Sequence, residues 1–254
     1  MSDLPKATAL ILAGTRPGGD PLANAMGMAH KSLIEIGGKP MLSRVIEAVR
    51  DAQITEIVVS TDCEPVAVLA KDCGALVRTS LSGPSATVAA AFDEFGAPMI
   101  VTTADHALLR AEWVGDLVRK TDRSADVAIM MAERGAIEAA VPETKRTYLK
   151  MADGAWSGCN LFYLQAAEAR RAIDQWQAIE ADRKRPWKIA GKLGLSTMLS
   201  YAAGRLSMAD AVTKIGGRMG ISAQLVPAND GRAAIDVDKP ADIDLVRQIL
   251  GDGA

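Results

Sequence analysis

The sequence predicts an α/β protein built around a largely parallel sheet, and two observations carry that prediction. Short apolar runs alternate with longer amphipathic segments through the first half of the chain, which is the pattern of βαβ units. The chain has 254 residues, of which 49% are hydrophobic and 24% are charged, as in ordinary globular proteins rather than disordered or fibrous ones. Proteins of this size and class often form one unit, so we expect a single domain over residues 1–254.

The elements of the first half follow from their apolar spacing. We expect strands at 7–13, 56–60, 75–77, 99–102 and 126–131, and helices at 41–52, 65–71, 85–95 and 112–120. In the first helix, for example, Leu42, Val45 and Val49 recur at helical spacing. Parallel sheets bind ligands at the carboxyl ends of their strands, so functional residues should follow the first and fourth strands.

The second half is less regular and richer in helices. Strands at 147–151 and 160–164 flank the turn signal Asp153-Gly154, and helices are expected at 165–180, 187–193, 197–203 and 208–218. Strands at 223–226 and 234–237 and a helix at 240–250 complete the chain. We therefore expect a helical insertion over about 165–220.

Charge and composition exclude several classes of function. Lys and Arg number 29 against 31 Asp and Glu, so a broad basic surface for nucleic acid is not expected. The three cysteines and two histidines lack the spacing of a zinc site, which leaves carboxylates as candidate metal ligands. With no apolar run of about 20 residues and no secretory leader, we expect a cytoplasmic protein without stable membrane insertion. A homodimer is left open.

The segment 12–42, which follows the first strand, is the first candidate site. Gly14 lets backbone amides approach a phosphate chain closely, and Arg16 and Lys31 supply positive charge. The segment matches neither the P-loop nor the G-x-G-x-x-G pattern. The alternative interpretation is a flexible surface loop.

Acidic residues provide a second candidate. Asp105 follows the fourth strand, where a carboxylate can bind Mg²⁺ that bridges phosphate oxygens, although Asp is also a common helix cap. Asp236 and Asp238 would point to the same face of a strand, so either could complete a carboxylate pair with Asp105. The alternative for this region is helix-start chemistry, which accounts well for Asp242 after Pro240. His106 is expected to be a polar neighbour rather than a ligand.

A third candidate is the stretch 183–192, where five of ten residues are basic. Such a run is often only a solvated helix face. The functional interpretation is a clamp for an acceptor phosphate, with Arg185 and Lys188 as candidates, or a weak contact with an anionic membrane surface.

Several ordered motifs carry a resemblance to a known family. Leu12-Ala13-Gly14, the pair Met26-Gly27, Lys31 and the run 38–42 resemble the nucleotide-binding signature of sugar-phosphate nucleotidyltransferases, in particular the group that includes molybdenum cofactor guanylyltransferase. The segments around Asp105 and 235–243 resemble two further family motifs. Thr15, Ala104 and Ala107 depart from the family pattern.

The resemblance implies a fold, an activity and a set of site residues. The fold is a Rossmann-like three-layer α/β/α sandwich with a mixed, mostly parallel sheet, as in nucleotide-diphospho-sugar transferases. The activity is Mg²⁺-dependent transfer of a nucleoside monophosphate from a nucleoside triphosphate, with CTP or GTP favoured, to a sugar, polyol or alcohol phosphate, releasing pyrophosphate. The implied nucleotide-binding residues are Leu12, Ala13, Gly14, Thr15, Lys31, Gly83, Ser85 and Asp105. The implied catalytic residues are Lys31 and Arg16. The resemblance further implies that Asp105, Asp238 and Asp236 bind the metal and that Asn160 contacts the acceptor.

Ordinary structural roles compete with some of these assignments. The turn before the helix at 85–95 also fits a helix capped by Ser82 or Ser85, and Asn160 also fits a turn. Two other functions are compatible with such a chain: a glycosyltransferase that uses a nucleotide-sugar, and a non-catalytic nucleotide-binding regulatory module. The pair of Lys31 and Asp105 favours the nucleotidyltransferase.

Overall fold

The computed structural model describes residues 4–15, 18–144, 146–181 and 194–251. The strands are β1 (Thr8–Leu12), β2 (Glu35–Ile36), β3 (Lys39–Pro40), β4 (Glu56–Thr61), β5 (Leu76–Thr79), β6 (Met99–Thr103), β7 (Val127–Glu133), β8 (Leu149–Met151), β9 (Gly154–Leu164) and β10 (Ala223–Pro227). The α-helices are α1 (Pro21–Ala25), α2 (Met41–Asp51), α3 (Glu64–Asp72), α4 (Pro84–Phe95), α5 (Ala111–Lys120), α6 (Arg134–Ala140), α7 (Ala169–Ala181), α9 (Leu195–Ala202), α10 (Met208–Arg218) and α11 (Pro240–Leu250). Two short 3₁₀ helices, η1 (Lys31–Leu33) and η2 (Gly231–Ala234), complete the set.

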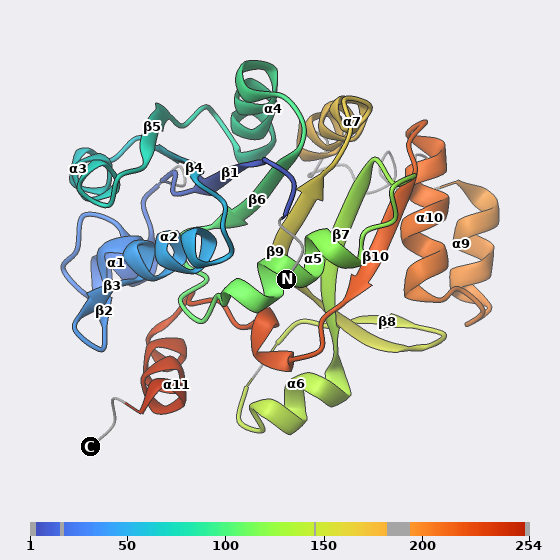
Figure 1. The fold of residues 1–254 in the computed structure, drawn as a ribbon. Coiled ribbons are helices and arrows are strands. Elements are labelled where there is room, and N and C mark those ends of the chain that lie inside the picture. Colours follow the sequence, from blue (N-terminus) through green and yellow to red (C-terminus); the bar gives the residue numbers. More distant parts are fainter. Residues whose placement is uncertain (1–3, 16–17, 145, 182–193, 252–254) are drawn as a thin grey trace.

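A mixed sheet of eight strands forms the centre of the molecule (Figure 1). Its order is β10-β7-β9-β6-β1-β4-β5, and β8 extends it from β9. The long strand β9 runs antiparallel to β6, β7 and β8, and the remaining pairs are parallel. The expected Rossmann-like α/β/α fold with a mostly parallel sheet is confirmed.

Alternation along the strands divides the core between the two faces of the sheet. On β1, Leu10 packs with α4 and α7, whereas Ile11 packs on the opposite face with α2, α3, α5 and α11. Figure 1 shows α4 and α7 side by side on one face of the sheet, and α2 and α5 on the other face. Both faces of β1 are thus buried, which explains why this strand reads as one continuous apolar run.

Most expected elements of the first half lie where the pattern predicts, but the segment 12–42 is not one long loop. It contains α1, η1 and the β2–β3 hairpin. Asp20 caps α1 by accepting hydrogen bonds from the backbone N–H groups of Leu22 and Ala23. The flexible-loop alternative does not apply to the described part of this segment. The sequence interpretation also missed α6 and the first six residues of β9.

The strand expected at 234–237 is wrong. The chain there forms η2 and then crosses the end of β6, where the Val237 N–H donates to the Asp105 carbonyl at 3.1 Å. The chain packs closely on α6 at the start of η2, where a Cβ on Gly231 would lie 2.2 Å from the carbonyl oxygen of Ala136. Asp236 and Asp238 therefore do not share one face of a strand.

The stretch 165–220 contains α7, α9 and α10 in its described part, in line with the helices expected there. The helix expected at 187–193 lies outside the described residues. No helix in the described ranges is long and apolar enough to cross a bilayer. Cys63, Cys73 and Cys159 are all free.

Candidate active site

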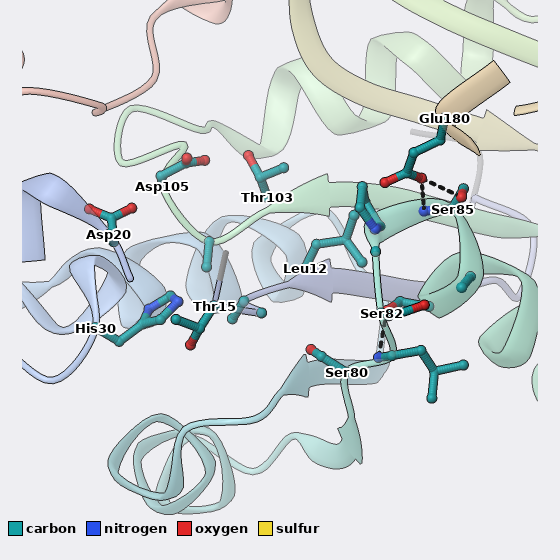
Figure 2. Close-up of a pocket in the computed structure, with 18 of the residues that line it drawn as sticks. Leu12, Thr15, Asp20, His30, Ser80, Ser82, Ser85, Thr103, Asp105 and Glu180 are labelled. Carbon is teal, nitrogen blue, oxygen red and sulfur yellow. Dashed lines mark hydrogen bonds between the residues drawn. The ribbon is translucent and has the colours of Figure 1, made fainter. Parts of the chain in front are cut away.

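A cleft of about 780 Å³ opens at the carboxyl ends of β1 and β6. Its walls come from three loops and from α7; the lining residues are Leu12, Ala13, Gly14, Thr15, Asp20, His30, Lys31, Ser80, Leu81, Ser82, Gly83, Pro84, Ser85, Ala86, Thr87, Thr103, Ala104, Asp105, Gln177 and Glu180. Figure 2 shows Asp20 and His30 at one end, which we call the lysine end, and Ser85 and Glu180 at the other, which we call the α4 end. The cleft lies where a parallel sheet is expected to bind its ligand.

The loop after β1 forms the floor of the lysine end. The Ala13 N–H donates to the Ser60 carbonyl at 2.8 Å, and the Thr15 N–H donates to Asp62 Oδ1 at 2.8 Å. Burial would raise the pKa of Asp62, but the hydrogen bonds from Thr15 hold it below its ordinary value. Gly14 faces Ser80, whose Oγ would lie 2.8 Å from an added Cβ. Residues 12–15, expected to bind nucleotide, therefore do line the cleft.

Lys31 lies at the centre of the lysine end. It opens η1, where the ring of His30 accepts the Ser32 N–H and caps the turn. Lys31 Nζ lies 2.6 Å from Asp105 Oδ2, 2.6 Å from Asp238 Oδ1 and 3.9 Å from Asp20 Oδ2. Burial alone would lower the pKa of Lys31, but Asp105 and Asp238 outweigh it and raise the pKa above its ordinary value. We call Lys31 and these three aspartates the lysine cluster.

The acidic side chains of the lysine cluster fit a divalent cation. Asp105 is 9% exposed, and its Oδ1 is buried without a hydrogen-bond partner in the described structure. The side chain of Asp238 is half exposed and faces the same lysine. Across the described residues, no three His, Cys, Asp or Glu side chains form a complete ligand set. Mg²⁺ commonly needs only one or two carboxylates, with phosphate oxygens and water completing its shell.

A second buried cluster lies beyond Asp105. Arg146 pairs with Asp236, and Asn160 Nδ2 donates to Asp236 Oδ2 at 2.7 Å. Burial would raise the pKa of Asp236, but Arg146 and then Asn160 hold it below its ordinary value. Asn160, with a φ of 48°, occupies the left-handed region inside β9. We call Arg146, Asp236 and Asn160 the arginine cluster.

His106, next to Asp105, is fully buried beside Trp113, with the ring centroids 6.0 Å apart. Burial lowers its pKa to about 4, against the opposing effect of the nearby carboxylates. The imidazole is therefore neutral at physiological pH and belongs to the packing under the site.

The helix-cap alternative is wrong for Asp105 and correct for Asp242. Asp105 caps no helix, because α5 begins at Ala111 with Arg110 as its N-cap. Asp242 does serve the start of α11, where its carboxylate accepts the N–H groups of Asp238 and Lys239 at 3.0 Å each. The helix-start chemistry thus belongs to Asp242, and it leaves the Asp238 side chain to Lys31.

The α4 end is built from two helices. The N-cap of α4 is Gly83, and no side-chain hydrogen bond caps the helix at this position. The expectation that Ser82 or Ser85 caps the helix is therefore wrong. Instead, Glu180 of α7 accepts hydrogen bonds from the N–H and Oγ of Ser85, as Figure 2 shows. Both Gly83 and Ser85, expected to bind nucleotide, line the cleft.

Three predicted residues cannot be placed, and three others were missed. Arg16, Arg185 and Lys188 lie outside the described residues. Asp20 had a local signal, because an Asp directly before Pro21 is a typical helix start. Arg146 and Glu180 had none, because long-range packing alone brings them to the site.

Comparison with known proteins agrees with the geometry. The profile of the family described as MobA-like NTP transferase domain matches residues 9–186. A solved structure titled as a hypothetical transferase from Thermus thermophilus has a TM-score of 0.79 and 26% identity, covering 94% of this chain and 100% of that one.

More distant solved structures share the fold. CMP:2-keto-3-deoxy-manno-octonic acid synthetase complexed with CTP has a TM-score of 0.61 and 19% identity, covering 98% of this chain and 100% of that one. 2-C-methyl-D-erythritol 4-phosphate cytidylyltransferase from Thermus thermophilus has a TM-score of 0.55 and 16% identity, covering 96% of this chain and 98% of that one. Among curated proteins no significant match is found.

Proposed function

Because the chain belongs to the MobA-like NTP transferase family, we propose that this nucleotidyltransferase moves a nucleoside monophosphate from CTP or GTP to a phosphorylated small molecule. The acceptor class is a sugar, polyol or alcohol phosphate. One observation carries the proposal: Lys31 Nζ lies 2.6 Å from carboxylate oxygens of both Asp105 and Asp238, at the glycine-loop end of a nucleotide-sized cleft. The whole chain would act as one domain, with 165–220 as its helical insertion.

The reaction needs positioning and charge neutralisation more than proton transfer. An oxygen of the acceptor phosphate attacks the α-phosphorus in line and forms a new P–O bond. The bond from the α-phosphorus to the α,β-bridging oxygen breaks, and pyrophosphate leaves with those electrons. The attacking phosphate is already anionic, so no general base is required, and the rate depends on orientation and on stabilising the developing charge.

The lysine end supplies the groups for this chemistry. The backbone of residues 12–15 would hold the triphosphate, while Lys31 and Arg16 neutralise charge on the phosphates. Lys31 now lies between two carboxylates, so we propose that it exchanges one of them for a phosphate oxygen when the nucleotide binds. The base and ribose would extend toward Gly83 and Ser85 at the α4 end.

The carboxylates of the lysine cluster would hold Mg²⁺. Asp105 and Asp238 are the proposed ligands, supported by the unpartnered Oδ1 of Asp105 in the described structure. When bound, the cation would neutralise phosphate charge and orient the triphosphate. Asp236, the third candidate, is engaged by Arg146 and Asn160, which favours a role on the acceptor side.

The arginine cluster borders the proposed acceptor position. Asn160 and Asp236 lie beyond Asp105, on β9 and in the crossing segment, and the Arg146 Nε is buried without a hydrogen-bond partner among the described residues. A guanidinium suits a phosphate, so Arg146 joins Asn160, Arg185 and Lys188 as a proposed acceptor contact.

Three free cysteines support a reducing, cytoplasmic setting.

Pyrophosphate release tests the proposal directly. The purified protein would be assayed with four nucleoside triphosphates against sugar, polyol and alcohol phosphates. Lys31→Ala should reduce release at least about 10²-fold, whereas Lys120→Ala, on a surface lysine of α5 paired with Asp116, should leave it unchanged. Nucleotide-sugar turnover would indicate a glycosyltransferase, and nucleotide binding without any turnover would indicate a regulatory module. Either result would contradict the proposal.

A further inference from the structure

Glu180 reaches the cleft from a helix that the sequence does not connect with it. It lies in the last turn of α7, and its Oε2 accepts a hydrogen bond from the Ser85 N–H at 3.2 Å and another from the Ser85 hydroxyl. The carboxylate thereby caps α4, which has no side-chain cap of its own. Figure 2 shows Glu180 directed toward the wall formed by Ser82 and Ser85.

The absence of a side chain at Gly83 leaves room for this carboxylate. A Cβ on Gly83 would lie 2.5 Å from Glu180 Oε1, closer than two non-bonded atoms can approach. The φ of Gly83 is −176°, an extended value open to any residue, so backbone strain does not require glycine there. The requirement for a small residue comes from Glu180, which links the predicted Gly83 to a residue about one hundred positions away.

Only one of the two carboxylate oxygens is anchored. Both hydrogen bonds from Ser85 go to Oε2, and within the described structure Oε1 accepts no hydrogen bond. The anchored oxygen holds the group in place, while Oε1 stays available as an acceptor in the lining of the cleft. Gln177, three residues earlier on α7, lines the same end.

The proposed function fixes which end of the cleft meets the base. Among the described lining residues, Lys31 is the only lysine or arginine, and it lies at the lysine end with the carboxylates proposed to hold Mg²⁺. Glu180 lies at the α4 end. With the triphosphate at Lys31 and the cation, the base is brought to Glu180. Leu12, Leu81 and Pro84 offer apolar surface for its faces.

We propose that Glu180 reads the base as a hydrogen-bond acceptor and selects guanine; this inference rests on the proposed function. Guanine presents two adjacent donors, N1–H and the N2 amino group, to a carboxylate. Cytosine and adenine each set a single amino group beside a ring-nitrogen acceptor, and uracil sets N3–H between two carbonyls, so each brings a lone pair against the carboxylate. Charge-assisted N–H···O⁻ bonds are strong and specific, so this one residue decides between bases.

Equilibrium binding tests this without any acceptor. Calorimetric titration of the full chain in Mg²⁺ with GTP, dGTP, CTP and UTP should show GTP and dGTP binding at least about tenfold more tightly than CTP and UTP. Glu180→Gln, which keeps the size and a hydrogen-bond acceptor for Ser85, should weaken GTP at least about tenfold and leave CTP and UTP within about twofold. Glu94→Gln, on α4 and paired with Arg78 at the surface, is the matched control and should leave the affinity for all four nucleotides unchanged.

The outcomes separate this inference from the proposed function. Equal loss of all four nucleotides in Glu180→Gln, or a wild-type preference for CTP, would overturn the guanine assignment while the nucleotidyltransferase stands. A selective loss of GTP but not dGTP would assign Glu180 to the ribose 2′-hydroxyl and also overturn it. Absence of any nucleotide binding by the wild type would overturn both. Ser85→Ala, which removes one anchor of the carboxylate, should give a smaller loss of GTP affinity in the same direction.

Discussion

The lysine cluster and the arginine cluster are similarly buried at their centres but differ in charge balance. The side chains of Lys31 and Asp105 are 11% and 12% exposed, and those of Arg146 and Asp236 are 17% and 13% exposed. In the arginine cluster one guanidinium meets one carboxylate, which also accepts from the amide of Asn160. In the lysine cluster one ammonium faces three carboxylates, one of them at 3.9 Å.

This difference shows which cluster suits a cation. Buried charges are normally paired, because an uncompensated charge in a low dielectric is costly. In the arginine cluster the guanidinium and the carboxylate pair with each other. The lysine cluster sets one ammonium among three carboxylates, and acidic side chains grouped in this way can hold a divalent cation. We therefore expect mutations in the lysine cluster to lower mainly the rate of the reaction, and mutations in the arginine cluster to lower mainly the free energy of unfolding.

The largest expected effect is on catalysis in the lysine cluster. Asp105→Asn should lower kcat/KM for pyrophosphate release about 10³-fold, about 4 kcal/mol of transition-state stabilisation, because it removes a proposed metal ligand. The free energy of unfolding should change by less than about 1 kcal/mol, since Lys31 keeps Asp238 as an ionic partner and the repulsion between neighbouring carboxylates falls. Steady-state kinetics and urea denaturation measure the two quantities. A large loss of stability with unchanged kcat/KM would contradict the catalytic role of Asp105 and give it a structural role instead.

Ligand-linked stability should come next in size. At nucleotide–Mg²⁺ concentrations about 100-fold above Kd, the wild type should gain about 2.7 kcal/mol against unfolding. Chelation of the metal with EDTA should remove most of that gain. Thermal melts follow the effect, and Asp236→Asn should retain it whereas Asp105→Asn should not. A gain that EDTA leaves intact would rule out the carboxylates of the lysine cluster as a metal site.

The arginine cluster should matter most for stability, with a defined pH dependence. Asp236→Asn should cost about 2 kcal/mol at neutral pH, because Arg146 loses its charged partner. The folded pKa of Asp236 is held below its ordinary value of 3.8, so the stabilisation exists above that value and disappears as the pH falls through the folded pKa. The free energies of unfolding of wild type and variant should therefore converge as the pH falls below the folded pKa of Asp236. A difference that stays constant from neutral pH into the acid range would contradict the ionic origin.

A surface ion pair provides the smallest expected effect and the baseline for the others. Lys120 Nζ and Asp116 Oδ2 lie 2.8 Å apart, with side chains 38% and 25% exposed. Lys120→Ala should change the free energy of unfolding by less than about 0.5 kcal/mol and leave turnover at the wild-type level. A cost as large as that of Asp236→Asn would show that burial does not set the scale of these contributions.

Local sequence pattern was sufficient for most of the sheet and for the main residues at the lysine end of the cleft. The strands β1, β4, β6 and β7 are apolar runs buried on both faces, and such runs are visible without any knowledge of the partner strands. Gly14, Lys31 and Asp105 follow such strands or stand in ordered motifs, so their shared place at one end of the sheet was also predictable. Short elements held by tertiary contact, such as α6 and η2, were not.

The sequence by itself determined that this protein is an α/β nucleotidyltransferase with a glycine loop, a lysine and an aspartate at the carboxyl end of its sheet. Only the tertiary structure decided which charges meet. It placed Asp236 beside Arg146 and Asp238 beside Lys31, although the two aspartates lie two residues apart, because the segment forms η2 and then crosses the end of β6 instead of forming a strand. It also brought Glu180 to Gly83 and Ser85 across about one hundred residues. Periodicity follows from neighbours along the chain, whereas such pairings follow from how distant elements pack, and a linear pattern carries no signal for them.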